Sequence, residues 1–251
     1  MVEIYRKRIQ IAPVGFEVDR VVIPAIKEKA EKVYLMVHKD RSKDKATKYA
    51  AAIQRKLKAA NIETELVYCD WENIEEITRV ARDLILKESS NEVAINLASG
   101  SKNHAIGLDR ACMTFMKRKH IHPFYPEAEK WTAWRYPKQQ STGVKKIRQI
   151  PIHRIIVPEP ELVIALKAIK QDAVDVPMHK GKKGIKKKDL AKSLYGDSSK
   201  VNLTKLQRNI TQKLEKTWRA VEIIQVGQSD WISLTDEGKY LRYVLKNEET
   251  Y

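Results

Sequence analysis

Short apolar runs alternate with helical stripes of apolar residues along the first half of the chain. The runs predict buried strands because each is brief and is bounded by turn residues; they span 8–14, 33–37, 62–68, 92–97 and 121–125. The stripes predict helices because apolar side chains recur every three or four positions; they span about 18–30, 46–60, 74–85 and 103–116. Strict alternation of strand and helix predicts a parallel sheet with helices on both faces.

The pattern changes after residue 159. Helices are expected at 160–171, which begins with a proline, at 187–195, which is followed by a glycine, and at about 202–218. Two strands at 221–226 and 231–234, joined by a turn at 227–230, and a last helix at 235–246 complete the segment. This order of elements, with a hairpin after a long third helix, is typical of a winged helix-turn-helix domain.

We therefore predict an α/β protein with two domains. A Rossmann-like parallel sheet domain, residues 1–150, is followed by a linker, 151–159, and by a winged helix-turn-helix domain, 160–251. The last part of the first domain, 127–150, is expected to form either an extended return strand or a β-arm that crosses to a second subunit.

The loop N-L-A-S-G-S-K at 96–102 joins the fourth strand to the fourth helix. A small-residue loop at a helix start offers unpaired backbone N–H groups, the helix dipole adds partial positive charge, and Lys102 adds a full one. In a Rossmann-like order, 3-2-1-4-5, this loop lies beside the loop at 13–19, and ligands bind at that switch point. We expect an anion site there, although Gly100 and a serine cap also suit an ordinary tight turn.

Charge is concentrated in one segment of the second half. The formal net charge of the chain is +16, and residues 182–219 hold twelve Lys/Arg against three Asp/Glu. On the long helix, Lys205, Arg208, Asn209, Gln212 and Lys216 share one face, opposite Leu206, Ile210 and Leu214. Because guanidinium and amide groups suit base edges and lysines suit phosphates, we expect DNA binding by these five residues and by Lys186, Lys187 and Lys188.

Several function classes are disfavoured by what the sequence lacks. No G-x-G-x-x-G follows the first strand and no P-loop motif occurs, so a dinucleotide coenzyme or a P-loop nucleotide site is not expected. His120 and His122 lack a third ligand nearby, and we expect no metal. No apolar stretch reaches the ~20 residues of a membrane helix, and no signal peptide is evident, so we expect a cytoplasmic protein with reduced Cys69 and Cys112.

The loop at 96–102 is close to N-x-T-G-G-T-K, and on this architecture it resembles the CARF family of CRISPR-associated regulators. The resemblance implies a homodimer that binds a cyclic oligoadenylate across its axis. Carried over by position, the resemblance implies a ligand site in which Asn96 closes the fourth strand and fixes the loop. Phosphates and ribose would face Ser99, Gly100, Ser101, Lys102 and Asn103, and the first loop would contribute Gly15, Phe16 and Asp19. The sequence departs from the family pattern at Ala98, Ser99 and Ser101, so a different nucleotide is also compatible.

The leading hypothesis is a transcription regulator whose affinity for duplex DNA responds to a nucleotide second messenger. An alternative is a metal-independent ring nuclease that cleaves cyclic oligoadenylate with the help of Ser101 and Lys102, as some CARF proteins do. A second alternative is a non-enzymatic RNA-binding or protein-binding adaptor. We expect the regulator rather than an enzyme, with no cofactor beyond the nucleotide ligand.

Overall fold

The computed structural model describes residues 5–115, 120–132, 138–151 and 158–245. The chain divides into two compact units, Met1–Ile156 and Val157–Tyr251, and each is described by itself. No helix in the described ranges is both long and apolar enough to cross a bilayer.

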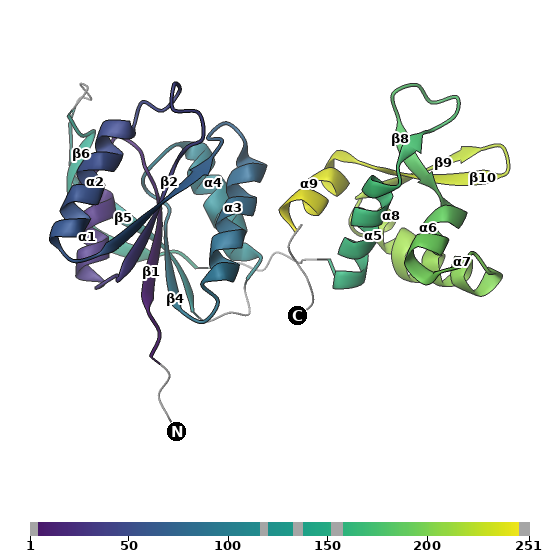
Figure 1. Cartoon of the computed structure of the whole chain (residues 1–251), viewed down its shortest axis with the longest axis horizontal. Helices are drawn as coiled ribbons and strands as arrows, with labels where there is room; N and C mark the ends of the chain where they lie inside the picture. Colours follow the sequence, from purple (N-terminus) through teal and green to yellow (C-terminus); the bar gives the residue numbers. More distant parts are fainter. Residues whose placement is uncertain (1–4, 116–119, 133–137, 152–157, 246–251) are drawn as a thin grey trace. The chain divides into compact units, whose positions relative to one another are not determined.

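Unit 1 is a six-stranded sheet with helices on both faces (Figure 1). Its strands are β1 (Arg8–Pro13), β2 (Lys32–His38), β3 (Glu63–Cys69), β4 (Glu92–Asn96), β5 (Ile121–Trp131) and β6 (Ser141–Gln149). Its helices are α1 (Asp19–Lys27), α2 (Thr47–Ala59), α3 (Ile74–Lys87) and α4 (Lys102–Met113). The strand order is β3-β2-β1-β4-β5-β6, all pairs being parallel except β5 with β6. The predicted Rossmann-like order is confirmed.

Two apolar layers hold the helices to this sheet. Ile9, Ile11 and Met36 point to one face and pack with α3 and α4, while Ala12 and Leu35 point to the other and pack with α1 and α2. Successive residues of a strand face opposite sides. In β2, Tyr34 and Met36 are therefore buried in one layer and Val33 and Leu35 in the other, as expected for a sheet covered on both faces.

Within the segment 127–150, the described residues form an antiparallel return strand. β5 continues seven residues beyond its pairing with β4, from Tyr125 to Trp131, and β6 runs back along it with a bulge between Glu127 and Ala128. This extension packs against α1 rather than leaving the unit. Of the two alternatives for this segment, the return strand is the one present within the described residues.

Unit 2 combines a small antiparallel sheet with a helical cluster (Figure 1). Its helices are α5 (Pro160–Gln171), α6 (Lys187–Tyr195), α7 (Lys200–Leu206), the π-helical turn η1 (Gln207–Thr211), α8 (Gln212–Lys216) and α9 (Asp236–Val244). Its strands are β7 (Val174–Asp175), β8 (Lys183–Lys186), β9 (Val221–Val226) and β10 (Ser229–Leu234), in the order β7-β8-β10-β9. One core of leucine, isoleucine and alanine side chains joins α5 and α6 to the long helix and to this sheet.

The long helix formed by α7, η1 and α8 departs from regular α-helix in the middle. Thr211 is fully buried, and its Oγ1 lies 3.3 Å from the carbonyl oxygen of Gln207 and 3.4 Å from that of Leu206. A π-turn holds one residue more than an α-turn, so it brings Thr211 into the core beside Ile210. The expected inner residues Leu206, Ile210 and Leu214 are all buried.

Candidate functional site

The loops that follow β1 and β4 touch each other at the carboxyl edge of the unit 1 sheet. A Cβ atom placed on Gly15 would lie 2.6 Å from the backbone nitrogen of Gly100 and 2.9 Å from its Cα. Gly100 has φ +82°, and a Cβ there would lie 2.8 Å from Cβ of Pro13. Such distances leave no room for a side chain at either position, so only glycines allow the two loops to meet at the switch point.

The β4–α4 loop presents the features of an anion site. Lys102 is exposed and forms no ion pair with any residue that the structure describes. Ser99 is 1% exposed, and its Oγ has no hydrogen-bond partner among the described residues. Ser101 is the N-cap of α4, a helix of twelve residues whose dipole places partial positive charge at this end. The arrangement gives a charged lysine, a helix N-terminus and an unused hydroxyl on one short loop.

The buried side chain of Asn96 sets the shape of this loop. Its Nδ2 donates to the carbonyl of Arg20 at 2.8 Å, and its Oδ1 accepts from the backbone N–H of Ala98 at 2.9 Å. Because Asn96 is fully buried, it binds the start of the β4 loop to α1 rather than offering its amide to a ligand. Asn96 therefore fixes the β4 loop, as the resemblance implied.

Three other expected residues bind neighbouring segments in the structure. The Asn103 amide donates to the carbonyl of Trp71 at 3.0 Å, and the ring of Phe16 packs on Tyr49 with centroids 5.4 Å apart. Asp19 accepts from the N–H of Gly143 and from Lys56, both at 3.1 Å. Burial alone would raise the pKa of Asp19, but these hydrogen bonds outweigh it and lower the pKa.

The β5–β6 extension consists of the end of β5 from Tyr125 to Trp131, residues 138–140 and β6. It caps the N-terminus of α1. The side-chain oxygen of Gln139 accepts from the N–H groups of Val18 at 2.9 Å and Asp19 at 3.0 Å. These are donors that a helix start leaves unsatisfied, and here a neutral amide oxygen occupies the place where an anion would bind. In the described part of the chain, in contrast, the start of α4 is capped by its own Ser101 and His104 alone.

A buried ion pair fastens the same extension to α1. Arg20 donates to Glu17 at 3.0 Å and to the carbonyl of Pro126 at 2.8 Å, while Ser141 donates to the Glu17 carboxylate. The Arg20 side chain is only 2% exposed because the rings of Tyr125 and Trp131 cover it at 4.8 and 5.3 Å. Residues 16–20 are thus held by partners more than a hundred positions away in the sequence.

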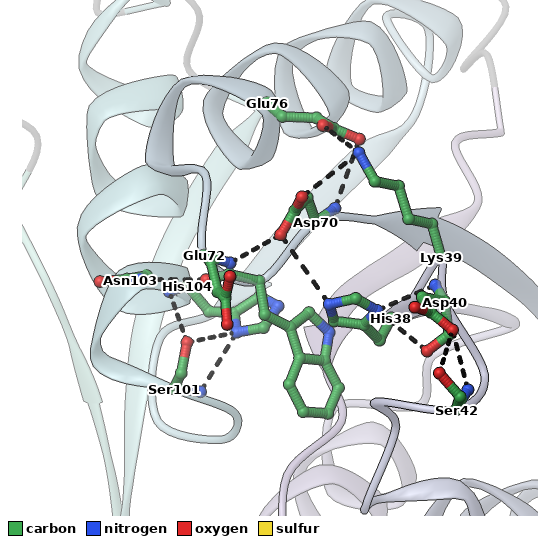
Figure 2. A network of polar contacts seen from close by, with 11 residues as sticks. His38, Lys39, Asp40, Ser42, Asp70, Glu72, Glu76, Ser101, Asn103 and His104 are labelled. Atoms are coloured by element: carbon green, nitrogen blue, oxygen red, sulfur yellow. Dashed lines mark hydrogen bonds and ion pairs between the residues drawn. The ribbon is translucent and has the colours of Figure 1, made fainter.

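His104, which the sequence analysis did not select, lies at the centre of the α4 start. Its Nδ1 accepts from the N–H of Ser101 at 3.1 Å and lies 2.9 Å from the Ser101 hydroxyl (Figure 2). Because Nδ1 accepts a hydrogen bond from a backbone N–H, the ring proton is on Nε2, which has no partner in the described part of the chain. Burial, with a smaller contribution from His38, lowers the pKa of His104 to about 4.

Polar residues from the ends of β2 and β3 extend this network (Figure 2). His38 accepts the N–H of Asp40 at 2.9 Å, and its Nε2 lies 3.8 Å from the Asp70 carboxylate. The N–H of Glu72 and the Lys39 ammonium lower the pKa of Asp70. Trp71 packs edge-on against His38 and His104, with ring centroids 5.3 and 5.6 Å apart, and links the two imidazoles.

The burial of neutral His104 predicts a loss of stability in acid. The folded state holds its pKa near 4 against 6.5 in an exposed histidine, so the stabilisation is complete above pH 6.5. It is lost as the pH falls from 6.5 towards 4, by about 3 kcal/mol in total. Chemical denaturation at pH 7, 5.5 and 4.5 measures this loss. His104→Gln keeps an acceptor for the N–H of Ser101 and should flatten the profile; an equally steep profile would contradict this role of His104.

In unit 2 the eight residues expected to bind DNA lie on the long helix and at the start of α6. Lys205, Arg208, Asn209, Gln212 and Lys216 are all exposed, as are Lys186 and Lys188. A shallow groove lined by Lys200, Val201, Thr204, Lys205, Arg208 and Asn209 runs along the first half of the helix. Lys187 is partly neutralised by Asp230 at 3.4 Å, and the Lys205 ammonium lies 4.7 Å from the ring centre of Tyr195.

The described residues contain no group of three or more His, Cys, Asp or Glu side chains that could hold a metal ion. The imidazole of His122 pairs with the carboxylate of Glu92 at 2.8 Å. Cys69 and Cys112 are buried free thiols, and burial raises the pKa of both.

Comparison with solved structures gives distant likenesses. Csm6 from Enterococcus italicus bound to cyclic hexa-2'-fluoro-hexa-dAMP is 12% identical, with a TM-score of 0.41, over 66% of this chain and 46% of that one. Can2 from Sulfobacillus thermosulfidooxidans in complex with cyclic tetra-adenylate is 11% identical, with a TM-score of 0.41, over 93% of this chain and 61% of that one. TM-scores this low carry no argument about ligand or activity.

Comparison of sequences gives a family match and a relative. The uncharacterized protein MJ1513 of Methanocaldococcus jannaschii is 27% identical over 188 residues, which are 65% of this chain and 56% of that protein. The chain thus spans little more than half the length of this relative. Residues 8–131, which hold β1 to β5 and the whole candidate ligand site except the end of the β5–β6 extension, match the family HFX_2341_N:-like, N-terminal.

Proposed function

We propose that the protein is a DNA-binding regulator that responds to a nucleotide second messenger. Unit 1 binds a phosphate-rich ligand of the cyclic oligoadenylate type at the carboxyl edge of its sheet. Unit 2 is a winged helix-turn-helix domain that binds duplex DNA. The contact between Gly15 and Gly100 carries the ligand part of the proposal, because it brings the two switch-point loops together at the start of α4.

The ligand class follows from what the site offers. Exposed Lys102, the N-terminus of α4 and the unpartnered hydroxyl of Ser99 favour phosphate oxygens. Neutral His104 adds no charge at pH 7 but fixes Ser101 through the capping hydrogen bonds. One such loop per subunit suits a ligand with repeated phosphates, so a homodimer that binds a cyclic molecule across its two-fold axis is part of the proposal.

The DNA part is supported by the arrangement of unit 2. Helix α6 and the long helix pack in one core, and the β9–β10 hairpin that follows them has the two-residue turn Gly227–Gln228 expected of a wing. The exposed face of the long helix carries Arg208 and Asn209 beside lysines. In this domain class the long helix enters the major groove, where arginine and asparagine read base edges.

One observation favours cleavage of the ligand as a second candidate function. The Ser101 hydroxyl lies 2.9 Å from Nδ1 of His104, and Lys102 follows it in the chain. A hydroxyl held by an imidazole, beside an ammonium, could orient a ribose 2′-OH and stabilise the charge of a phosphorane. Chromatography of cyclic tetra-adenylate after prolonged incubation with the protein tests this: linear products support cleavage, and an intact ring leaves sensing alone.

The experiment that tests the regulator is the affinity of the protein for duplex DNA in the presence and absence of cyclic tetra-adenylate. We expect the ligand to change the dissociation constant by about 5–150-fold, the usual range of coupling between two sites. An unchanged dissociation constant would contradict coupling between the ligand and the DNA site. Absence of binding to duplex DNA would contradict the regulator as a whole.

A further inference from the structure

A strained, exposed methionine forms the tip of the β7–β8 hairpin in unit 2. Met178 is 96% exposed and has φ +63°. A bulky residue in the left-handed region is uncommon and strained, and a fully solvated apolar side chain gains nothing from burial. Both features are unfavourable for folding alone, and strain of this kind concentrates at functional sites.

The backbone of the hairpin shows where the strain comes from. The N–H of His179 donates to the carbonyl of Val176 at 3.2 Å, so Pro177 and Met178 are the two central residues of a tight turn. A proline followed by a residue with positive φ is the pattern of a type II turn, whose third position favours glycine. In the next turn, closed by Lys182 N–H to the carbonyl of His179 at 3.1 Å, that position is held by Gly181 at φ +81°.

The base of the hairpin is anchored while its tip is free. Val176 is 3% exposed and packs with Ile224 and Trp231, and its N–H donates to the carbonyl of Lys182 at 2.9 Å. β7 and β8 then pair through Val174 with Gly184 and Asp175 with Lys183. The Pro-Met tip therefore projects from a fixed support.

Within the hairpin, lysines follow the tip in the chain, and one acidic residue, Asp175, precedes it. Lys180 and Lys183 are exposed and form no ion pair with any residue in the described ranges, whereas Lys182 is paired with Glu222 at 2.7 Å. Proline and methionine are among the side chains that DNA-bending proteins insert between base steps from the minor groove, with cations beside them on the phosphates. A hydrophobic wedge beside unpaired lysines fits a nucleic acid better than an apolar protein pocket.

Strand register places this tip away from the wing. β8 is antiparallel to β10, with Gly184 opposite Ser233 and Lys186 opposite Trp231. The tip of the β7–β8 hairpin therefore lies at the end of the sheet opposite to the turn at Gly227, and the two hairpins project in different directions (Figure 1). A duplex bound by the long helix and the wing must therefore bend if it is also to contact this tip.

We propose that the Pro177–Met178 turn is a minor-groove wedge, a second DNA contact that bends the duplex bound by unit 2. This rests on the proposed DNA-binding function and adds a separate site to it. Apolar wedges of this kind kink DNA by about 20–90°.

Energy transfer between dyes on the two ends of a 40-base-pair duplex tests the wedge, with a duplex that the protein selects from a random pool. We expect the wild type to bend this duplex. Met178→Gly should bend it little and bind it several-fold more weakly, yet raise the midpoint of thermal unfolding by about 2–6 °C, because glycine relieves the strained φ. Loss of function with gain of stability separates a wedge from a structural residue.

Two control variants complete the test. Met178→Leu keeps an apolar wedge and should bend DNA as the wild type does. Ile164→Ala, at a half-exposed apolar position on α5, should change neither the bend nor the affinity for the duplex. Lys180→Ala should lower the slope of log affinity against log salt by about 1. An unbent duplex, or equal bending by Met178→Gly, overturns the wedge and leaves the regulator intact. Preference for structured RNA, or no selected duplex at all, overturns both.

Discussion

Replacing Gly15 with alanine should strongly weaken ligand binding at the switch point. The new Cβ would lie 2.6 Å from a backbone nitrogen of Gly100, and a backbone atom cannot turn aside as a side chain can. The two loops would separate, with an expected cost of about 1–3 kcal/mol in the free energy of unfolding. Since both loops must meet to hold the ligand, we expect affinity for cyclic tetra-adenylate, measured by calorimetry, to fall at least about 100-fold.

Lys102→Ala is the matched variant that leaves the packing alone. Lys102 is exposed and has no ion pair within the described residues, so its loss should leave the unfolding transition unchanged. Removal of a charge-assisted phosphate contact should weaken the same ligand about 10–100-fold. Gly181→Ala, where φ is +81° but no atom lies within 4 Å of the new Cβ, controls for backbone strain at a glycine without a clash. Full ligand affinity in both Gly15→Ala and Lys102→Ala would place the ligand elsewhere.

Arg208→Ala should give the largest loss of DNA affinity among variants of unit 2. Arg208 lies on the exposed face of the long helix and lines its groove with Val201 and Asn209. A guanidinium bound to a base edge contributes about 1–3 kcal/mol, so affinity for the selected duplex should fall about 5–150-fold. Fluorescence anisotropy at two salt concentrations measures the loss and separates base reading from phosphate contact.

A conservative variant and a distant control distinguish base reading from an effect of net charge. Arg208→Lys keeps the charge but not the planar fork, so it should lose discrimination between sequences while keeping the salt dependence. Lys170→Ala removes one exposed positive charge from α5 and should leave affinity for the selected duplex within about twofold. Equal losses in Lys170→Ala and Arg208→Ala would mean that net charge, and not the face of the long helix, determines binding.

The sequence predicts elements best where a local signal ends them. Helix α5 begins at Pro160 and α6 ends before Gly196, whose φ is +86°. Both helix ends were predicted at the correct residue because proline and glycine restrict or allow backbone angles at their own position. Strands β7 and β8 were missed because two-residue and four-residue strands in a lysine-rich segment show no apolar alternation. The π-turn was missed because Leu206, Ile210 and Leu214 fit a regular helix equally well.

In the candidate ligand site too, residues with a local sequence signal could be predicted and the others could not. The meeting of Gly15 and Gly100 follows from strand order, which the alternation of elements predicts. His104 had a local signal, since it stands at the third position after the Ser101 cap where a capping box places its second member. Trp71 and Gln139 had no local signal. They follow β3 and lie in the β5–β6 extension, respectively, far away in the sequence, and only folding brings them to the site.

In the proposed regulator, the ligand loop of unit 1 and the expected DNA-binding face of unit 2 act on one another. The most direct measurement is the dissociation constant of the wild-type protein for its selected duplex, with and without saturating cyclic tetra-adenylate, repeated with Lys102→Ala. We expect a shift of about 5–150-fold in the wild type, and the variant should need about 10–100-fold more ligand to reach the same shift. The same dissociation constant with and without ligand, in a protein that calorimetry shows to bind the ligand, would contradict it.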